Sequence, residues 1–335
     1  MATINDVCKA AGVSKATVSR VINGSPQVRE KTRIRVLETM KSLGYQPNVL
    51  AQALATNTSN TIGLILPHFD SHYFGSILKQ TAQTLQKSKK KLFVMESHNS
   101  EDGEIEAINT LTTQRCDAII IYSRYLSEEQ LIHYQHQIQR PLVILNRFLS
   151  AQQLVSFSFD QYQLGTLAVE HLLELGHRQI ACLTTPLDNQ TGLLRLQAYR
   201  DSLTKREIPV DEALIIEGKS THFWGYAAVM QLLDQGREFS AIFSCNDDMA
   251  LGAIRALHER GLSVPKDVSV IGIDNEPAAF YSIPSLSTVS LPIEQLTIDA
   301  TNLAIKLTNK IPCSPHHFEY YGSLEYREST RPLES

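Results

Sequence analysis

The amino-acid sequence predicts a small all-α head joined to an α/β body made of two doubly wound parallel sheets. Residues 1–46 hold three short helical patterns, and apolar strands alternate with amphipathic helices from residue 62 onward. Nine candidate strands at this spacing fit two sheets better than one. We therefore expect a head (1–46), a connecting segment (47–60) and a body (61–335).

The charge distribution supports the same division. Residues 1–60 carry eight Lys or Arg against three Asp or Glu, whereas the remaining 275 residues carry 23 against 32. A basic head on an acidic body is typical of a polyanion-binding module attached to a domain with another task.

Composition excludes several classes of protein. No segment approaches the roughly 18 apolar residues that span a membrane, and the N-terminus lacks the apolar core of a secretory signal. The five cysteines lie singly, which argues against a disulfide framework or a structural zinc site. We expect a cytoplasmic globular protein with reduced thiols, no membrane association, no metal and no cofactor.

Capping residues mark the first two helices of the head. Thr3 can cap a helix that Gly12 would end, and Ser14 can cap a second helix that runs to Asn23. A third helix is expected from about residue 30 to 43. Its apolar positions lie three residues apart, at Ile34, Leu37 and Met40.

Two helices joined by a glycine-containing turn have the layout of a helix-turn-helix. The N-terminal residues of the second helix would then reach base edges in the major groove. Lys15 and Arg20 could contact guanine, and Ala16 could contact a thymine methyl group. Five further residues suit phosphate contacts: Ser14, Thr17, Asn23, Thr32 and Arg33. The alternative is a helical hairpin that only packs on the body, because a lone helix-turn-helix match is weak evidence.

In the body, nine apolar segments are candidate strands, with helices of 10–17 residues between most of them, as parallel sheets require. They are 62–66, 92–95, 118–122, 142–145, 155–159, 180–184, 214–216, 241–244 and 268–273. A strand-like segment at 286–291, a helix from 292 to about 308 and a terminal hairpin-like segment follow. The change of sheet near residue 160 predicts an N-subdomain (about 61–159 and 291–320) and a C-subdomain (about 160–290 and 321–335).

Polar residues stand directly after several of these strands, where open parallel sheets bind ligands. They are His68, Tyr122, Asn146, Arg147, Asn246, Asp247 and Asp274. Paired donors and acceptors suit vicinal hydroxyls, and aromatic faces suit a sugar ring. Individually each could instead cap a helix, and Asp247 is expected to do so.

Three other features of the sequence do not indicate a further functional site. The basic run at 87–91 (KSKKK) indicates a solvated surface rather than a second nucleic-acid site. His133 and His136 lack a third partner for a metal. Phosphate-loop, dinucleotide, nucleophile-elbow and zinc-protease motifs are missing, which argues against an enzyme.

The whole head segment, from TINDVCKAAGVSKATVSRVIN to GYQPNVLAQAL, closely resembles the head of the lactose/galactose repressor family. The resemblance implies that Lys15 and Ala16 set sequence specificity and that Arg20 contacts a base. It also implies that residues 48–55 form a hinge helix that inserts Leu54 into the minor groove. Tyr45, Asn48 and Ala51 complete the expected DNA-contacting set.

A helix of eight residues is too short to be stable alone in water. The hinge would therefore need the paired copy of a second subunit, so we expect a homodimer that reads a pseudo-palindromic double-stranded operator.

The body also resembles that family and, through it, the periplasmic sugar-binding fold, in stretches such as TIGLILP, NDDMALGA and VSVIGIDN. The resemblance implies an effector site made of His72, Tyr73, Asn146, Asp160, Arg195, Asn246 and Asp274. Ser220 stands where the family often has a ring that stacks on the ligand, and Phe223 or Trp224 could replace it. The function implied is a transcriptional repressor of a carbohydrate-utilisation operon, controlled by a small sugar or glycoside. A purine-like effector, a cytoplasmic small-molecule-binding module and a Rossmann-type enzyme remain the alternatives.

Overall fold

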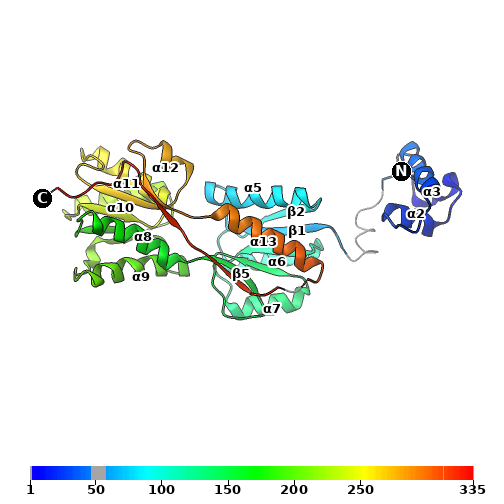
Figure 1. Cartoon of the computed structure of the whole chain (residues 1–335), viewed down its shortest axis with the longest axis horizontal. Coiled ribbons are helices and arrows are strands. Elements are labelled where there is room, and N and C mark those ends of the chain that lie inside the picture. Colours follow the sequence, from blue (N-terminus) through cyan, green and yellow to red (C-terminus); the bar gives the residue numbers. More distant parts are fainter. Residues whose placement is uncertain (1, 47–57, 312, 335) are drawn as a thin grey trace.

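The computed structural model describes residues 2–46, 58–311 and 313–334, arranged as a helical head and an elongated α/β body (Figure 1). The head consists of α1 (Ile4–Ala11), α2 (Lys15–Ile22) and α3 (Glu30–Ser42). The expected caps are confirmed: the Thr3 side chain accepts from the backbone N–H of Asp6, and that of Ser14 from Thr17. Gly12 ends α1 in the left-handed conformation, with φ of 62°, which a side chain would strain.

The apolar face predicted for α3 consisted of Ile34, Leu37 and Met40, and the prediction is wrong for the first two. Ile34 and Leu37 are each 48% exposed, whereas Met40 and Val36 are buried against α1 and α2. Residues three apart rotate about 60° backward around a helix at each step, so a strict three-residue spacing leaves one face within two steps. Val36 and Met40, four apart, stay together on the buried side.

The N-subdomain is a six-stranded parallel sheet with the order β11-β5-β4-β3-β1-β2. Its strands are β1 (Thr61–Leu66), β2 (Lys91–Glu96), β3 (Ala118–Tyr122), β4 (Leu142–Leu145), β5 (Val155–Phe159) and β11 (His317–Tyr320). Its helices are α5 (His72–Lys87), α6 (Glu101–Thr113), α7 (Glu128–Ile138) and α13 (Ile293–Thr308).

The C-subdomain is a second six-stranded sheet, with the order β12-β10-β9-β8-β6-β7, parallel except for β12. Its strands are β6 (Ile180–Thr184), β7 (Ile215–Glu217), β8 (Ala241–Ser244), β9 (Ser269–Asp274), β10 (Ser287–Ser290) and β12 (Ser323–Glu325). Its helices are α8 (Gln161–Glu174), α9 (Gln190–Lys205), α10 (His222–Asp234), α11 (Asp247–Glu259) and α12 (Pro277–Tyr281), with a 3-10 turn at Glu212–Leu214. That turn occupies the start of the strand expected at 214–216.

The chain passes between the two sheets three times: from β5 to α8, from β10 to α13 and from β11 to β12. The terminal hairpin expected from the sequence is therefore wrong. β11 pairs in parallel with β5 in one sheet, and β12 pairs antiparallel with β10 in the other. Each strand instead forms the edge of a different sheet.

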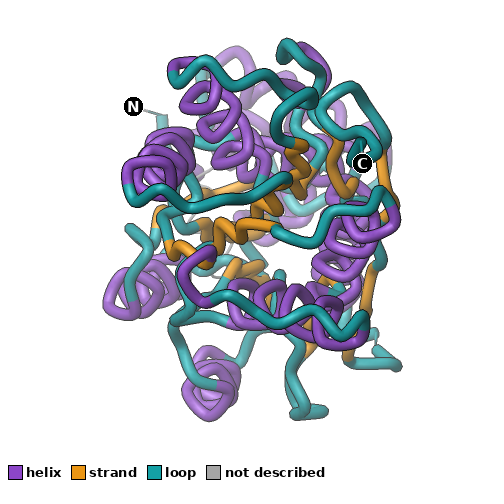
Figure 2. The backbone as a smooth tube through the Cα atoms, turned by 90° about the vertical axis from the view of Figure 1, so that its left-hand side faces the viewer, coloured by secondary structure: helices purple, strands orange, loops and turns teal. Residues whose placement is uncertain are grey.

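Helices lie on both sides of the strands, as the end-on view shows (Figure 2). All six residues of β1 and all five of β3 and β6 are buried, as expected for strands covered on both faces. Within the part of the chain that the structure describes, no helix is long and apolar enough to cross a membrane.

Candidate functional site

The α2 helix presents its N-terminal residues to solvent. Lys15, Ala16 and Arg20 are exposed, while Val18 and Val21 anchor the opposite face in the head core. The Ser14 and Thr17 hydroxyls are hydrogen-bonded to each other at 2.9 Å at the N-terminus of the helix. The arrangement is that of a helix free to enter a groove with one face.

The other head residues expected at DNA are more varied. Thr32 is half-buried at the start of α3, Asn23 caps the end of α2, and Tyr45 packs against the head core. Arg33 already has two partners within the head: it donates a hydrogen bond to the Ser25 carbonyl at 2.6 Å and forms an ion pair with Glu30 at 3.4 Å. Three expected contacts, Asn48, Ala51 and Leu54, lie outside the described residues.

A cleft separates the two subdomains at the carboxyl ends of their strands. Residues at the ends of β1, β3, β4, β6, β8 and β9 line it, and it contains about 700 Å³ of space that is partly open to solvent. Its lining includes Tyr73, Asn146, Arg195, Asn246 and Asp274 from the expected effector set. A second hollow, lined by residues 123–127 and 188–191 among others, adjoins it and shares Arg124, Asn146, Asn189 and Thr191.

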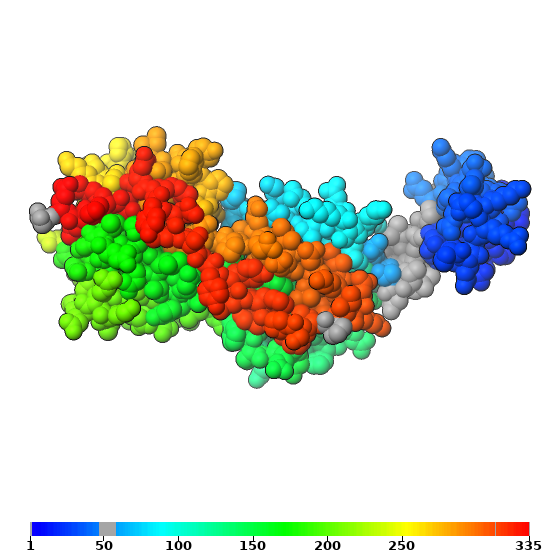
Figure 3. All heavy atoms as spheres, in the orientation of Figure 1, coloured from blue at the N-terminus to red at the C-terminus, as the bar shows by residue number. Residues whose placement is uncertain are grey.

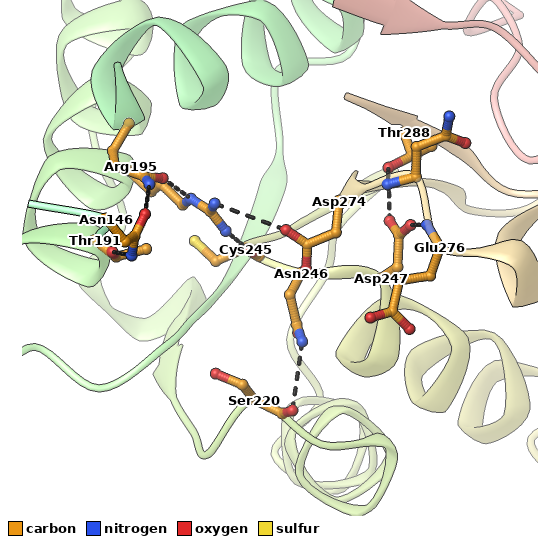
Figure 4. Close-up of polar contacts among 12 residues, drawn as sticks. Asn146, Thr191, Arg195, Ser220, Cys245, Asn246, Asp247, Asp274, Glu276 and Thr288 are labelled. Carbon is orange, nitrogen blue, oxygen red and sulfur yellow. Dashed lines mark hydrogen bonds and ion pairs between the residues drawn. The ribbon is translucent and has the colours of Figure 1, made fainter. Parts of the chain in front are cut away.

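Arg195 is the centre of the polar network in the cleft (Figure 4). It is 4% exposed, and its Nε donates to Gln161 Oε1 at 2.8 Å while Nη1 donates to the Cys245 carbonyl. Its Nη2 lies 3.8 Å from Asp274 Oδ1. A guanidinium held on three sides is fixed in place before any ligand arrives.

Asn146 connects the two subdomains across the cleft. It follows β4 in the left-handed conformation, with φ of 61°, and its amide donates to the hydroxyls of Tyr122 and Thr191. Its carbonyl oxygen accepts from Gln161 at 3.0 Å. Since Tyr122 belongs to the N-subdomain and Thr191 and Gln161 to the C-subdomain, a ligand that competes for Asn146 would also act on their separation.

Aromatic rings line the N-subdomain wall of the cleft. Phe74 and Tyr122 meet edge to face with centroids 5.0 Å apart, and Tyr73 packs against both. The Arg124 guanidinium lies 5.6 Å from the Phe74 ring and 5.4 Å from that of Tyr122. This wall offers apolar surface opposite a polar one, the combination that sugar rings require.

Burial raises the pKa of the carboxyl groups in the cleft. The pKa of Asp274 is raised well above its usual value, because loss of solvent outweighs the Arg195 charge. Burial, followed by the charge of Asp248, raises the pKa of Glu276 to about 7. Behind them, burial raises the pKa of Asp247 to about 7 although it accepts from Thr288 and from the Glu276 backbone.

Two members of the expected effector set do not line the cleft. His72 is exposed at the start of α5, while Ser71 and His68, which precede it in the chain, line the cavity. Asp160 caps α8 by accepting from Gln163. Likewise Asn246, not Asp247, caps α11, by accepting from Met249 at 3.1 Å. Phe223 and Trp224 are not among the lining residues, and Ser220 is.

Several lining residues were missed from the sequence. Gln161, Thr191 and Asn189 stand at the N-termini of α8 and α9, and Arg124 lies in the loop after β3. A signal was available for the first three, since helix N-termini that follow strands of one sheet lie at the same edge as the strand ends. Among the described residues no group of three or more His, Cys, Asp or Glu could hold a metal ion.

The helix-turn-helix head and two-sheet cleft define a ligand-responsive DNA-binding protein, and comparison with known proteins identifies its family. Residues 3–48 match the model of "Bacterial regulatory proteins, lacI family", and residues 169–330 match the "Periplasmic binding protein-like domain". The chain is 40% identical to the HTH-type transcriptional regulator AscG of Escherichia coli (strain K12) over 298 residues, 88% of this chain and 89% of that one.

Two solved structures extend the likeness over nearly the whole chain. The lac repressor dimer bound to operator and the anti-inducer ONPF has a TM-score of 0.88 at 31% identity, covering 98% of this chain and 99% of that one. The complex of the transcriptional regulator CelR with cellobiose has a TM-score of 0.73 at 29% identity, covering 98% and 100%. The chain belongs to the lacI family of bacterial regulatory proteins. It is a helix-turn-helix transcription regulator of that family.

Proposed function

We propose that the protein represses a carbohydrate-utilisation operon and that a small sugar or glycoside bound in the cleft controls its affinity for the operator. It acts as a homodimer on a pseudo-palindromic duplex, in the cytoplasm where that DNA lies, and performs no enzymatic reaction. The fixed Arg195 in a cleft between two hinged subdomains is the observation that carries this proposal.

The chemistry of the cleft favours a polyhydroxylated ligand. Arg195, Asn246 and Asp274 supply donors and acceptors on one wall, and the Tyr73–Tyr122 aromatic group supplies apolar surface on the other. Thr185 is 6% exposed on the cleft wall, and its buried hydroxyl has no hydrogen-bond partner in the structure. A buried hydroxyl without a partner is costly, and a ligand hydroxyl would satisfy it.

The position of the cleft favours a sugar or a glycoside in particular. It lies between two subdomains and at the carboxyl ends of parallel strands, which are places where small-molecule sites occur preferentially. The adjoining hollow along residues 123–127 leaves room for a second ring. CelR, which shares the fold, was solved with cellobiose.

Coupling to DNA would follow from the three chain crossings. A ligand shifts the equilibrium between open and closed bodies only by its different affinity for the two. Because residues 48–55 come directly before the N-subdomain in the chain, movement of paired N-subdomains would separate the two hinge segments of a dimer. Leu54→Ala should then weaken operator binding and leave ligand affinity unchanged.

The proposal is tested with the full-length protein and a ligand panel read by calorimetry and thermal shift. The panel contains galactose, glucose, cellobiose, an aryl β-glucoside and hypoxanthine. We expect a sugar or glycoside to bind, and Asp274→Ala to abolish that binding while DNA affinity is retained. Asp102→Ala, an exposed carboxylate on α6, is the matched control and should bind like the wild type. Binding of hypoxanthine alone, or unchanged binding by Asp274→Ala, would refute the sugar site.

A further inference from the structure

One end of the N-subdomain gathers positive charge from segments far apart in the sequence. Because the sheet is parallel, the carboxyl ends of its strands face the cleft and their amino ends lie at the opposite end, with the C-termini of α5, α6, α7 and α13. The connections there carry seven basic residues, which we call the head-side face: Lys87, Lys89, Lys90, Lys91, Arg115, Arg140 and Lys310.

The chain that comes from the head joins the body at this same face (Figures 1 and 3). Asp117 accepts from the Thr58 hydroxyl at 2.7 Å and from the backbone N–H groups of Ser59 at 2.8 Å and Asn60 at 2.9 Å. Lys90 donates to the Asn60 side chain at 3.3 Å. The head-side face is therefore the part of the body nearest in chain path to the DNA-binding helices.

Little acidic charge offsets the head-side face. Among the described residues of the connections 87–91, 114–117, 139–141 and 309–316, Asp117 is the one acidic residue. It is 3% exposed and lies 3.8 Å from Lys90. Lys87, Lys89 and Arg115 are exposed, so their charges act on the solvent in front of the face.

Helix ends alone do not account for this excess. Basic residues stabilise helix C-termini, and the C-subdomain has the same kind of ends. There, however, basic and acidic residues balance, six against six. The basic ones are Arg178, Lys205, Arg206, Arg237, Arg260 and Lys266, and the acidic ones are Glu207, Asp211, Glu212, Asp234, Glu238 and Asp267. Arg260 of that end is paired with Asp234. Only the end turned toward the head is strongly basic, on a body whose net charge is negative.

We infer that the head-side face binds the phosphate backbone of the DNA held by the head. This inference rests on the proposed DNA-binding function and adds a second, sequence-independent contact from the body. The basic run at 87–91 alone indicated a solvated surface; the fold adds Arg115, Arg140 and Lys310 to it. Lysine and arginine that displace counterions from DNA raise affinity without reading sequence. The face would also attract DNA within a Debye length of about 8 Å.

The test measures sequence-independent binding of the full-length protein to a 40-base-pair duplex of arbitrary sequence, by fluorescence anisotropy between 50 and 200 mM NaCl. The test variant is Lys87→Gln, Lys89→Gln, Arg115→Gln. The control variant is Lys205→Gln, Arg237→Gln, Lys266→Gln. It also removes two lysines and one arginine, but from the end of the C-subdomain that faces away from the head. Lys87 and Lys205 each end a 16-residue helix, so the loss of helix-end stabilisation is matched.

The slope of log K against log [salt] is negative, and each lost phosphate contact makes it less steep by about 0.9. We expect the slope of the test variant to be less steep than that of the wild type by roughly 1–3, and its binding at 100 mM NaCl to be several-fold weaker. The control variant and the charge-conserving variant Lys87→Arg, Lys89→Arg, Arg115→Lys should keep the wild-type slope. Equal slopes for the test and control variants would overturn the inference. Failure of the wild type to bind the duplex at all would instead contradict the proposed function.

Discussion

Arg20 lies on the exposed face of α2, one turn after Lys15 and Ala16, where its guanidinium can reach a base edge. Arg20→Ala should cost about 1–3 kcal/mol at one operator position, the value of a lost bidentate contact. Thr32→Ala should weaken all sequences alike, because a phosphate contact carries no sequence information. Selection of preferred duplexes from a random pool measures both. An unchanged preference for Arg20→Ala would place the recognition surface elsewhere.

Asp247 is fully buried, and burial raises its pKa to about 7. A carboxyl group whose pKa is higher in the folded than in the unfolded state stabilises the fold below its unfolded pKa, and this contribution is lost as pH rises toward 7. Asp247→Asn should therefore flatten the decline in stability between about pH 4 and pH 7. Urea unfolding of both proteins across this range measures the difference.

The comparison is made between variants because buried histidines act in the opposite direction. Burial lowers the pKa of His171 and of His177, so their contribution is lost as pH falls. Asp102→Asn serves as the exposed control and should follow the wild-type curve. A curve for Asp247→Asn parallel to that of the wild type at every pH would contradict a raised pKa.

For single residues, position directly after a strand was an informative but incomplete guide to the cleft. Asn146, Asn246 and Asp274 could be placed at the cleft because parallel strands end at a common edge. Arg124 could not, because side-chain direction in a loop depends on packing that the sequence pattern does not show. Its role in binding an effector, like that of the other cleft residues, stays a prediction.

Among the elements, the segment 58–60 is joined to the sheet mainly through one side chain. Asp117 accepts from all three of its residues, and hydrogen bonds to a charged acceptor are worth about 1.5–3 kcal/mol each when the partner is removed. Asp117→Ala should loosen the start of β1, so ligand binding would no longer be transmitted fully to the head. We expect near-normal ligand affinity with a several-fold smaller effect of ligand on DNA affinity.

Two measurements check this prediction. Hydrogen exchange at the amides of Ser59 and Asn60 should become faster in Asp117→Ala, and operator affinity should be measured with and without ligand. Asp102→Ala, which removes an exposed carboxylate of the same subdomain, is the control. A wild-type ligand effect in Asp117→Ala would show that the connection is not part of the switch.

Element boundaries in the sequence were clearest where local chemistry sets them. Thr3, Ser14 and Gly12 mark helix ends because their hydrogen bonds and backbone conformation are local. β11 and β12 were not predictable in the same way. Their partners, β5 and β10, lie about 160 and 35 residues earlier in the chain, and no local pattern records such pairing.

For the whole molecule, the proposed hinge requires a dimer. A helix of eight residues is marginal by itself, so residues 48–55 need a second copy to pack against. Sedimentation velocity at micromolar concentration should therefore show a dimer, both free and on DNA. A stable monomer under both conditions would rule out the paired hinge.

The three crossings also bear on how the protein is made. α13 packs against α5, β3 and β4 of the N-subdomain, and β11 forms an edge of its sheet, yet both follow almost the whole C-subdomain in the chain. On the ribosome, residues 61–159 must therefore wait for about 160 more residues before their sheet is covered by α13 and completed by β11. Until then the apolar surface that α13 will cover is available to chaperones or to other nascent chains. The connectivity that lets one subdomain move against the other thus gives the first-made half a late folding step and a period of exposure during synthesis.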